Sequence, residues 1–204
     1  MTVPPALASQ EEDEASSRDA TLIAESLADP ERFALVFDRH ADAIHRYVSR
    51  RLGPDLADDV VSDTFLTAFR KRATYDLSHQ DARPWLYGIA SRLIRANRRA
   101  ETRRNRLLAR SPVSETESFD DRSAARVTSA QLKPRLAKVL TTLSAADRDL
   151  LLLVAWADLT YEECATALGM PIGTVRSKLH RVRAKIRRAF GGVDPTGTSE
   201  KGTP

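Results

Sequence analysis

The sequence is poor in the features that build covalent cross-links or membrane anchors. Cys164 is its only cysteine, so the chain can form neither an intramolecular disulfide nor a zinc site built on several cysteines. No uninterrupted apolar stretch approaches the roughly 20 residues that a membrane-spanning helix requires. The first residues also lack the basic and then apolar layout of a signal peptide. We therefore expect a protein of the reducing cytoplasm, with no membrane partner.

Features of catalytic sites are equally scarce. The sequence contains no glycine-rich phosphate-binding loop, and no nucleophilic side chain stands in a recognisable setting. Its 4 histidines are scattered, and His40 and His45 are separated by a spacing that does not place them on one face of a helix. We therefore expect no catalytic residue, no cofactor and no metal ion.

The alternation of β-branched and polar residues that marks strands is also missing, and apolar residues recur instead with a period near 3.6. With 204 residues, of which 42% are hydrophobic, the chain can form one medium domain or two small ones. Its charge is unevenly placed, because 11–14 is acidic whereas 92–110 is almost purely basic. The sequence thus predicts an all-α protein with a polyanionic partner for part of its length.

Apolar residues with this period divide the chain into two blocks. The first block predicts helices at 19–27, 33–52, 56–72 and 83–110. Gly53 and Pro54 would end the second of these helices, and Asp55 can cap the third. The expected buried stripe of that third helix consists of Leu56, Val60, Phe65, Leu66 and Phe69. The second block predicts helices around 132–140, from Ser144 to Trp156, and within 159–188.

A serine-rich and acidic segment at 111–130 separates the two blocks. It contains hardly any apolar residue, so it predicts a flexible linker between a domain at 18–110 and a domain at 131–190. The two ends, 1–17 and 191–204, are rich in small and polar residues and have no periodicity. We expect both ends to be disordered tails.

The segment 159–188 has the pattern of a helix-turn-helix. Thr160 and Glu163 can form a capping box at the start of its first helix, and Gly169 can end that helix in the left-handed conformation. Four apolar residues then repeat at helical spacing: Val175, Leu179, Val182 and Ile186. The opposite face is basic and suits the major groove of DNA. A solvated basic face on a structural bundle is the alternative, but these signals together favour DNA binding.

The helix expected at 83–110 ends in a dense run of arginines. Glu101 is the single acid between Arg92 and Arg110, and such a density repels itself unless it is solvated or faces phosphate. Trp85 and Tyr87 precede this run. They could stack on unpaired bases or belong to the core of the domain.

Together these motifs resemble those of extracytoplasmic-function (ECF) sigma factors, the small two-domain type in the sigma-70 family of RNA polymerase sigma factors. The resemblance covers 33–190 and rests on LADDVVSDTFLTAF (56–69), RPWLYGIASRLIRANRR (83–99) and LTYEECATALGMPIGTVRSKLHRVRAKIR (159–187). Each motif alone is moderately specific, whereas their order and spacing across a linker are highly specific. The resemblance implies a protein that binds core RNA polymerase and directs promoter-specific transcription initiation.

The resemblance also implies three binding regions. The helix at 56–72 would dock on the β′ clamp of the polymerase, and the second domain on the β flap. The implied polymerase contacts are Asp58, Asp59, Asp63, Thr64 and Phe65. The implied minus-ten contacts are Trp85, Arg92, Arg95, Arg98 and Arg99. The implied minus-thirty-five contacts are Thr174, Arg176, Ser177, Lys178, His180 and Arg181. Promoter DNA and core polymerase are thus the implied partners, and an anti-sigma factor is left open as a third.

Two positions depart from the family pattern. Arg92 stands where the family commonly has an asparagine used near the flipped minus-ten base, which leaves the base preference there open. Cys164 replaces the usual isoleucine of the helix-turn-helix core, as a small apolar side chain can. A redox-sensing thiol is the alternative for Cys164. No third sigma domain is visible, and 111–130 fits the acidic connector that runs through the RNA-exit path in this family.

An ordinary helix-turn-helix regulator is the main alternative function. Such a regulator binds its operator as a dimer without polymerase, and its first domain would sense a ligand or a phosphate. The acidic motif at 58–65 and the tryptophan helix with its arginines have no role in such a protein. Measuring promoter binding with and without core polymerase separates the two functions.

Overall fold

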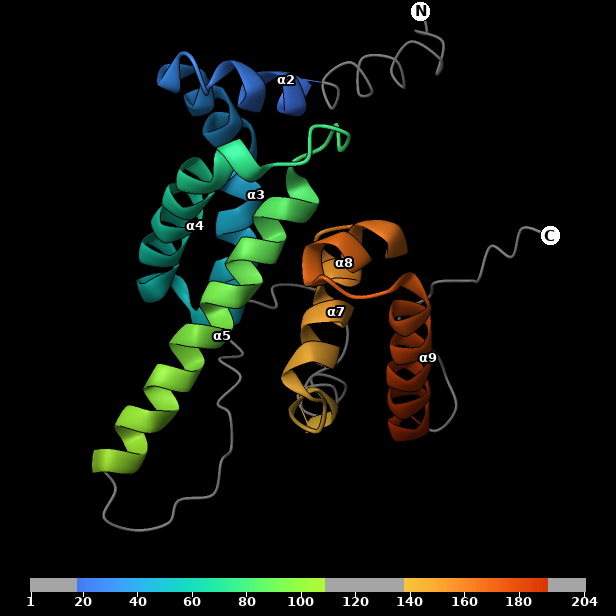
Figure 1. Ribbon diagram of the computed structural model, residues 1–204. Helices are drawn as coiled ribbons and strands as arrows, with labels where there is room; N and C mark the ends of the chain where they lie inside the picture. The colour runs from blue at the N-terminus through green and yellow to red at the C-terminus, as the bar shows by residue number, and fades with distance from the viewer. Residues whose placement is uncertain (1–17, 109–137, 191–204) are drawn as a thin grey trace, which may run out of the picture.

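The computed structural model describes residues 18–108 and 138–190, which form two helical domains (Figure 1). The first domain contains α2 (Arg18–Glu25), α3 (Ala34–Leu52), α4 (Ala57–Lys71) and α5 (Arg83–Leu108). Short 3-10 helices connect them at Pro30–Phe33, Pro54–Leu56 and Arg72–Thr74. The second domain has a helical turn at 138–141, then α7 (Ala145–Trp156), α8 (Tyr161–Leu168) and α9 (Ile172–Ala189). No strand occurs in either described stretch, and the all-α fold class is confirmed.

Most helices begin and end at the residues that the local sequence signals predict. Gly53 ends α3 with a φ of 85°, and Gly169 ends α8 with a φ of 63°, values that glycine adopts at low cost. The Ser144 hydroxyl accepts a hydrogen bond from the backbone of Asp147 at the start of α7. The two hydrogen bonds of the capping box that begins α8 are both present.

The start of α4 differs from the expectation. Asp55 lies in the 3-10 helix before α4 and caps nothing, while Leu56 occupies the cap position without a side-chain hydrogen bond. Pro54 fixes its own φ and begins this 3-10 turn, so the α-helical hydrogen bonds start later than the sequence suggests. The predicted cap at Asp55 is therefore wrong.

The core of the first domain forms where α3, α4 and α5 cross. Large apolar side chains from all three helices are buried there: Ile44, Val48, Val60, Phe65, Leu86 and Ile94. Leu66 was expected in this core, but it is 45% exposed. Phe65 and Leu66 are neighbours on a helix and point about 100° apart. Only one of the two can face the core, and Phe65 occupies that place.

The second domain is built around α7, whose apolar Leu150 and Leu153 are fully buried. The four apolar residues predicted for α9 are all buried, as expected: Val175, Leu179, Val182 and Ile186. The last two pack with Val139 and Leu140 from the helical turn at 138–141. The tails expected at 1–17 and 191–204, the linker expected at 111–130 and the start of the helix expected at 132–140 lie outside the described residues.

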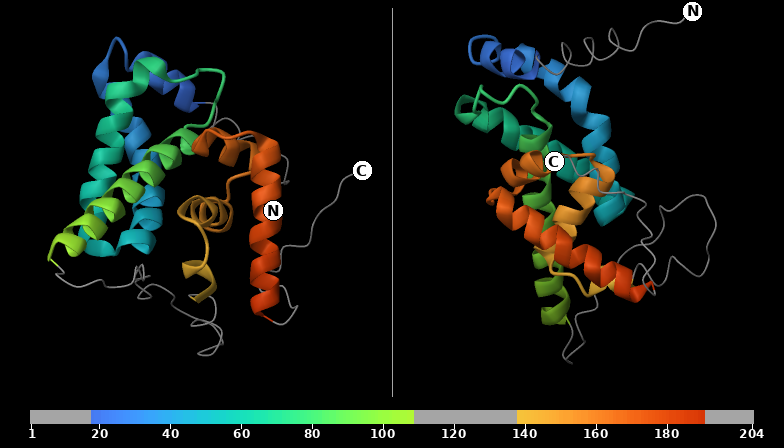
Figure 2. Two further views of the ribbon diagram at one scale, coloured as in Figure 1. Left: turned by 60° about the horizontal axis from the view of Figure 1, so that its bottom comes forward. Right: turned by 90° about the vertical axis from the view of Figure 1, so that its right-hand side faces the viewer.

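The two domains lie against each other. Figures 1 and 2 show α8 beside the N-terminal part of α5, while α9 lies on the far side of α7. One continuous apolar cluster includes Ile44 and Leu86 of the first domain together with Leu153 and Leu179 of the second. Among the helices in the described residues, none combines the length and the apolar character needed to cross a bilayer.

Candidate nucleic-acid interface

The face of α4 implied for polymerase binding is only partly exposed. The side chains of Asp58, Asp59 and Asp63 are exposed, and His45 lies 3.1 Å from the Asp58 carboxylate. By contrast, Thr64 and Phe65 are buried, at 0% and 5% exposure. The Thr64 hydroxyl donates to the carbonyl of Val60. Of the five implied contact residues, only the three acids are accessible.

The sequence analysis did not predict that two apolar side chains on this side of the first domain are exposed. Phe37 of α3 is 42% exposed and Leu66 of α4 is 45% exposed. The ring of Phe37 packs edge-on against buried Phe65, with centroids 4.8 Å apart. Helical periodicity could not predict the exposure of Phe37 and Leu66, because both positions also fit the buried stripe of an amphipathic helix.

The start of α5 is held by a residue far away in the chain. The carboxylate of Asp19 in α2 accepts hydrogen bonds from the backbone N–H of Ala82, at 3.0 Å, and from His40, at 2.7 Å. It also pairs with Arg39. Burial alone would raise the pKa of Asp19, but the bonds from His40, Ala82 and Arg39 lower it below its usual value. The ionised carboxylate thus anchors the segment that leads into α5.

Asp19, His40 and Asp81 bring their ligand atoms within 4.8 Å of one another, as a metal site would. The oxygens of Asp19, however, already accept from three donors of the protein. Asp81 bonds the backbone and the guanidinium of Arg83, at 2.8 and 2.7 Å. These hydrogen bonds account for the cluster as a structural network.

Trp85 stands at the beginning of α5 and is half-buried. Its ring lies 4.9 Å from that of buried Tyr75, at an interplanar angle of 55°. One side of the indole therefore belongs to the core, and the remainder is accessible. The contact with Tyr75 supports the core role, while stacking on an unpaired base stays a prediction for the accessible part of the ring.

The arginines of α5 occupy two different environments. Arg92 and Arg99 are exposed, although the Nε of Arg92 also donates to the carbonyl of Gly88 at 3.0 Å. Arg98 donates to the carbonyl of Arg51 at 2.5 Å, and Arg95 lies 3.4 Å from Asp149 of the second domain. The run that the sequence treats as one basic surface is therefore divided between solvent and protein contacts.

Asp149 and Arg51 form an ion pair inside the contact between the domains. Their atoms Oδ1 and Nη2 are 2.6 Å apart, and the two side chains are 0% and 1% exposed. Burial alone would lower the pKa of Arg51, but Tyr47 and Asp149 together raise it above its usual value. The pair joins residues 98 positions apart, so no local pattern in the sequence could reveal it.

The outward face of α9 carries the implied minus-thirty-five contacts. Ser177, His180 and Arg181 are exposed. The side chain of Arg176 is 64% exposed and lies 3.5 Å from Glu162. These four side chains project from the second helix of the helix-turn-helix, the face that enters a major groove in this motif.

Thr174 and Lys178 are less available than the other four. Thr174 is half-buried, and the ammonium group of Lys178 lies 2.8 Å from the Asp147 carboxylate of α7. Burial alone would raise the pKa of Asp147, but the bonds from Lys178 and Ser144 lower it. Lys178 is thus tied to α7 as well as placed beside the recognition face.

Cys164 lies inside the helix-turn-helix and is fully buried. Burial raises the pKa of its thiol to about 12. Since the thiolate is the species that reacts, this environment supports the role of a small apolar core residue and argues against the redox alternative.

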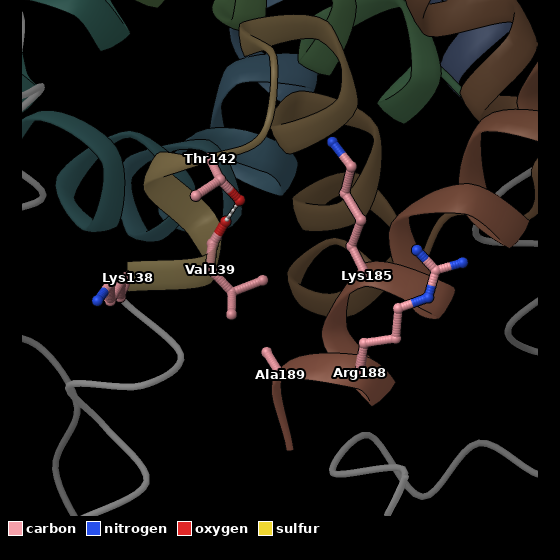
Figure 3. Close-up of a pocket in the computed structure, with 6 residues that line it drawn as sticks. All are labelled: Lys138, Val139, Thr142, Lys185, Arg188 and Ala189. Atoms are coloured by element: carbon pink, nitrogen blue, oxygen red, sulfur yellow. Dashed lines mark hydrogen bonds between the residues drawn. The ribbon is translucent and has the colours of Figure 1, made fainter. Parts of the chain in front are cut away.

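A pocket of about 560 Å³ opens at the end of α9 (Figure 3). Its lining includes three cationic residues: Lys138, Lys185 and Arg188. Their charged ends point in different directions around the apolar Val139 and Ala189 (Figure 3). The charges do not converge on one point, so the pocket does not form a site for a small anion.

Comparison with known proteins agrees with this arrangement. The sequence matches the family models described as Sigma-70 region 2, over 36–104, and Sigma-70, region 4, over 133–186. It is 31% identical over 178 residues to the RNA polymerase sigma factor NccH of Alcaligenes xylosoxydans xylosoxydans, a match that covers 85% of this chain and 92% of the relative.

One further similarity in sequence and one in fold agree with these matches. The ECF RNA polymerase sigma factor SigK of Mycolicibacterium vanbaalenii is 27% identical over 178 residues, covering 85% of this chain and 89% of the relative. The fold is similar to that of the sigma factor RpoE from Bartonella quintana, with a TM-score of 0.59, 22% identity, and coverage of 78% of this chain and 96% of that one. This chain therefore belongs to the sigma-70 family of RNA polymerase sigma factors and, within it, to the extracytoplasmic-function group.

Proposed function

We propose that the chain docks on core RNA polymerase through α4 and brings promoter DNA to α5 and α9. In this proposal 18–110 acts as sigma domain 2 and 131–190 as sigma domain 4. The observation that carries it is the joint exposure of Arg176, Ser177, His180 and Arg181 on the second helix of a helix-turn-helix. Such a face can read base edges in the minus-thirty-five element.

The polymerase contact is assigned to the exposed side of α4. Asp58, Asp59 and Asp63 provide negative charge, and exposed Leu66 and Phe37 provide apolar surface nearby. A mixture of this kind suits a protein interface, in which charges guide the encounter and apolar groups are buried. Buried Thr64 and Phe65 would support this surface from below, and Phe65 does so through its contact with Phe37.

The minus-ten contacts are assigned to α5. Exposed Arg92 and Arg99 can meet the DNA backbone, and the accessible part of the Trp85 ring can stack on an unpaired base. The relative RpoE was crystallised in complex with the anti-sigma factor NepR. A protein of that class is accordingly a candidate third partner for this chain.

The deciding experiment measures binding to promoter DNA with and without core polymerase. A sigma factor requires the core enzyme for tight and specific binding, so promoter affinity should rise strongly when core is added. Tight, sequence-specific binding by the chain alone, as a dimer, would instead identify it as an ordinary helix-turn-helix regulator.

The polymerase contact can be tested by charge reversal on α4. Changing Asp58 and Asp59 together to lysine should weaken binding to core enzyme by about tenfold or more, because like charges across an interface repel. Both side chains are exposed, so the domain should remain folded. The matched control changes Asp38 and Asp42 of α3, also exposed, to lysine. Equal affinity of the α4 variant and the parent for core would refute the assignment of this surface.

A further inference from the structure

The segment that leads into α5, residues 75–82, is exposed in its middle and fixed at the end that joins the helix. Residues 77–80 are all exposed. By contrast, Ala82 is fully buried, and its backbone N–H donates to the carboxylate of Asp19 at 3.0 Å, across 63 positions of sequence. The end of the segment is therefore held by α2, while the residues before it face solvent.

The hydroxyl of Tyr75 holds the same segment from a second side. It donates to the backbone carbonyls of His79, at 2.6 Å, and of Asp81, at 3.2 Å. Burial and the nearby acids raise the pKa of Tyr75, so the hydroxyl keeps its proton and remains a donor. The ring of Tyr75 also lies 4.9 Å from the ring of Trp85. Tyr75 thus contacts both the segment and the indole that follows it.

Trp85 belongs to the first turn of α5, so the direction of its ring depends on where and how this helix begins. An unpaired base can stack on an indole only when the face of the ring is turned toward it. We propose that Asp19 and Tyr75 are positioning residues, which fix residues 79–82 and thereby present the accessible part of the Trp85 ring to an unpaired minus-ten base. This inference rests on the proposed function, because that function assigns the base contact to Trp85.

The charge of Asp19 suits it for this role. Its two carboxylate oxygens accept from three donors: Arg39, His40 and the backbone of Ala82. A carboxylate offers acceptors only, whereas an amide side chain would turn its NH2 group toward at least one of these donors. A segment already held in its binding conformation loses less conformational entropy when it binds. Loss of the charge should therefore loosen the start of α5 and weaken the capture of a base.

Two variants test the positioning. Asp19→Asn removes the charge at nearly constant size, and Tyr75→Phe removes the hydroxyl while it keeps the ring beside Trp85. Ile23→Ala is the control for lost stability, because Ile23 is fully buried in the same helix α2 and its truncation leaves the Asp19 carboxylate intact. Asp42→Asn at an exposed site of α3 is the control for net charge.

The probe is a promoter duplex with mismatched minus-ten strands, which carries the fluorescent adenine analogue aminopurine at each unpaired position in turn. It is bound to the full chain together with core polymerase. Stacking on the indole should quench one position, and Trp85→Ala should abolish that quenching. Asp19→Asn should lose most of the quenching and about tenfold in affinity for this duplex, because a charged hydrogen-bond acceptor is lost. Tyr75→Phe should lose a smaller part of both.

Affinity for core enzyme should stay at the value of the parent in both variants, and the two controls should keep the quenching. The proposal is overturned if Asp19→Asn keeps the quenching of the parent. It is also overturned if Ile23→Ala loses as much quenching as Asp19→Asn at the same loss of thermal stability. Circular dichroism checks the folding of each variant. If Asp19→Asn does not fold, unchanged quenching in Tyr75→Phe overturns the proposal.

Failure of the proposed function has a different signature, because it appears in the parent chain. Promoter binding would then not depend on core polymerase, or no quenching would depend on Trp85. If only the positioning is wrong, the parent binds with core and its quenching is lost in Trp85→Ala, but Asp19→Asn behaves as Asp42→Asn does.

Discussion

The two basic helices of this protein, α5 and α9, have similar compositions but differ in what their faces contact. In α9 the polar face is turned to solvent, and Arg176 pairs only at the surface with Glu162. In α5 the second domain covers the side at Gly88, and Arg95 lies against buried Asp149. The comparison teaches that a basic stretch predicts an affinity for polyanions, whereas tertiary packing decides whether that affinity is available.

We expect the largest effect from removing the buried ion pair between Arg51 and Asp149, which would reduce the difference in accessibility between α5 and α9. Changing Arg51 to Met should weaken the association of the domains by about 3–5 kcal/mol, because Asp149 loses its closest charged partner while buried. Hydrogen exchange of the amides in α5 and α8 measures the association. Both helices should exchange faster in the variant.

The neighbouring residue offers a matched control. Arg50 lies over the Trp156 ring at 5.3 Å, but its side chain is exposed. Changing Arg50 to Met should therefore cost only about 1 kcal/mol or less. Equal effects of the two substitutions would show that burial of the Arg51 charge does not hold the domains together.

We expect intermediate effects from two substitutions that distinguish contacts to base edges from contacts to phosphates. Changing Arg176 in α9 to Ala should cost about 1–3 kcal/mol of promoter affinity and relax the preference at one or two upstream positions. Changing exposed Arg99 in α5 to Ala should weaken all promoters together and flatten the salt dependence by about one unit.

Transcription in vitro from a library of promoters, with core polymerase present, measures both effects. The upstream preference should respond to Arg176 and not to Arg99. An unchanged upstream preference in Arg176→Ala, together with a shifted one in Arg99→Ala, would reverse the assignment of the two helices to the two promoter elements.

The smallest expected effect concerns how the helices begin. The α8 helix starts at a local capping box, whereas the start of α5 is held by Asp19 from a distant helix. Changing Thr160 to Ala should lower the stability of the second domain by about 1 kcal/mol. Thr166→Ala, at an exposed position within the same helix, is the control and should be neutral or slightly stabilising. Thermal unfolding followed by circular dichroism compares the two, and a loss as large in Thr166→Ala would contradict the role of the cap.

The sequence by itself determined the helices and the family. The capping box at Thr160, the left-handed turn at Gly169 and the apolar stripe of α9 depend on neighbours within a few residues, and such short-range interactions can be recognised in a linear pattern. The order of the three motifs, which needs no geometry, identified the chain as a sigma factor of the extracytoplasmic-function group.

Tertiary structure alone decided which side chains are accessible. Whether Phe65 or Leu66 faces the core depends on the crossing of three helices, and the partner of Arg51 lies 98 positions away. Asp19 and Gly88 also gain their roles from distant segments, α5 for Asp19 and α8 for Gly88. Helical periodicity repeats within a few residues and carries no information about such contacts, so only the packing of the two domains could reveal them.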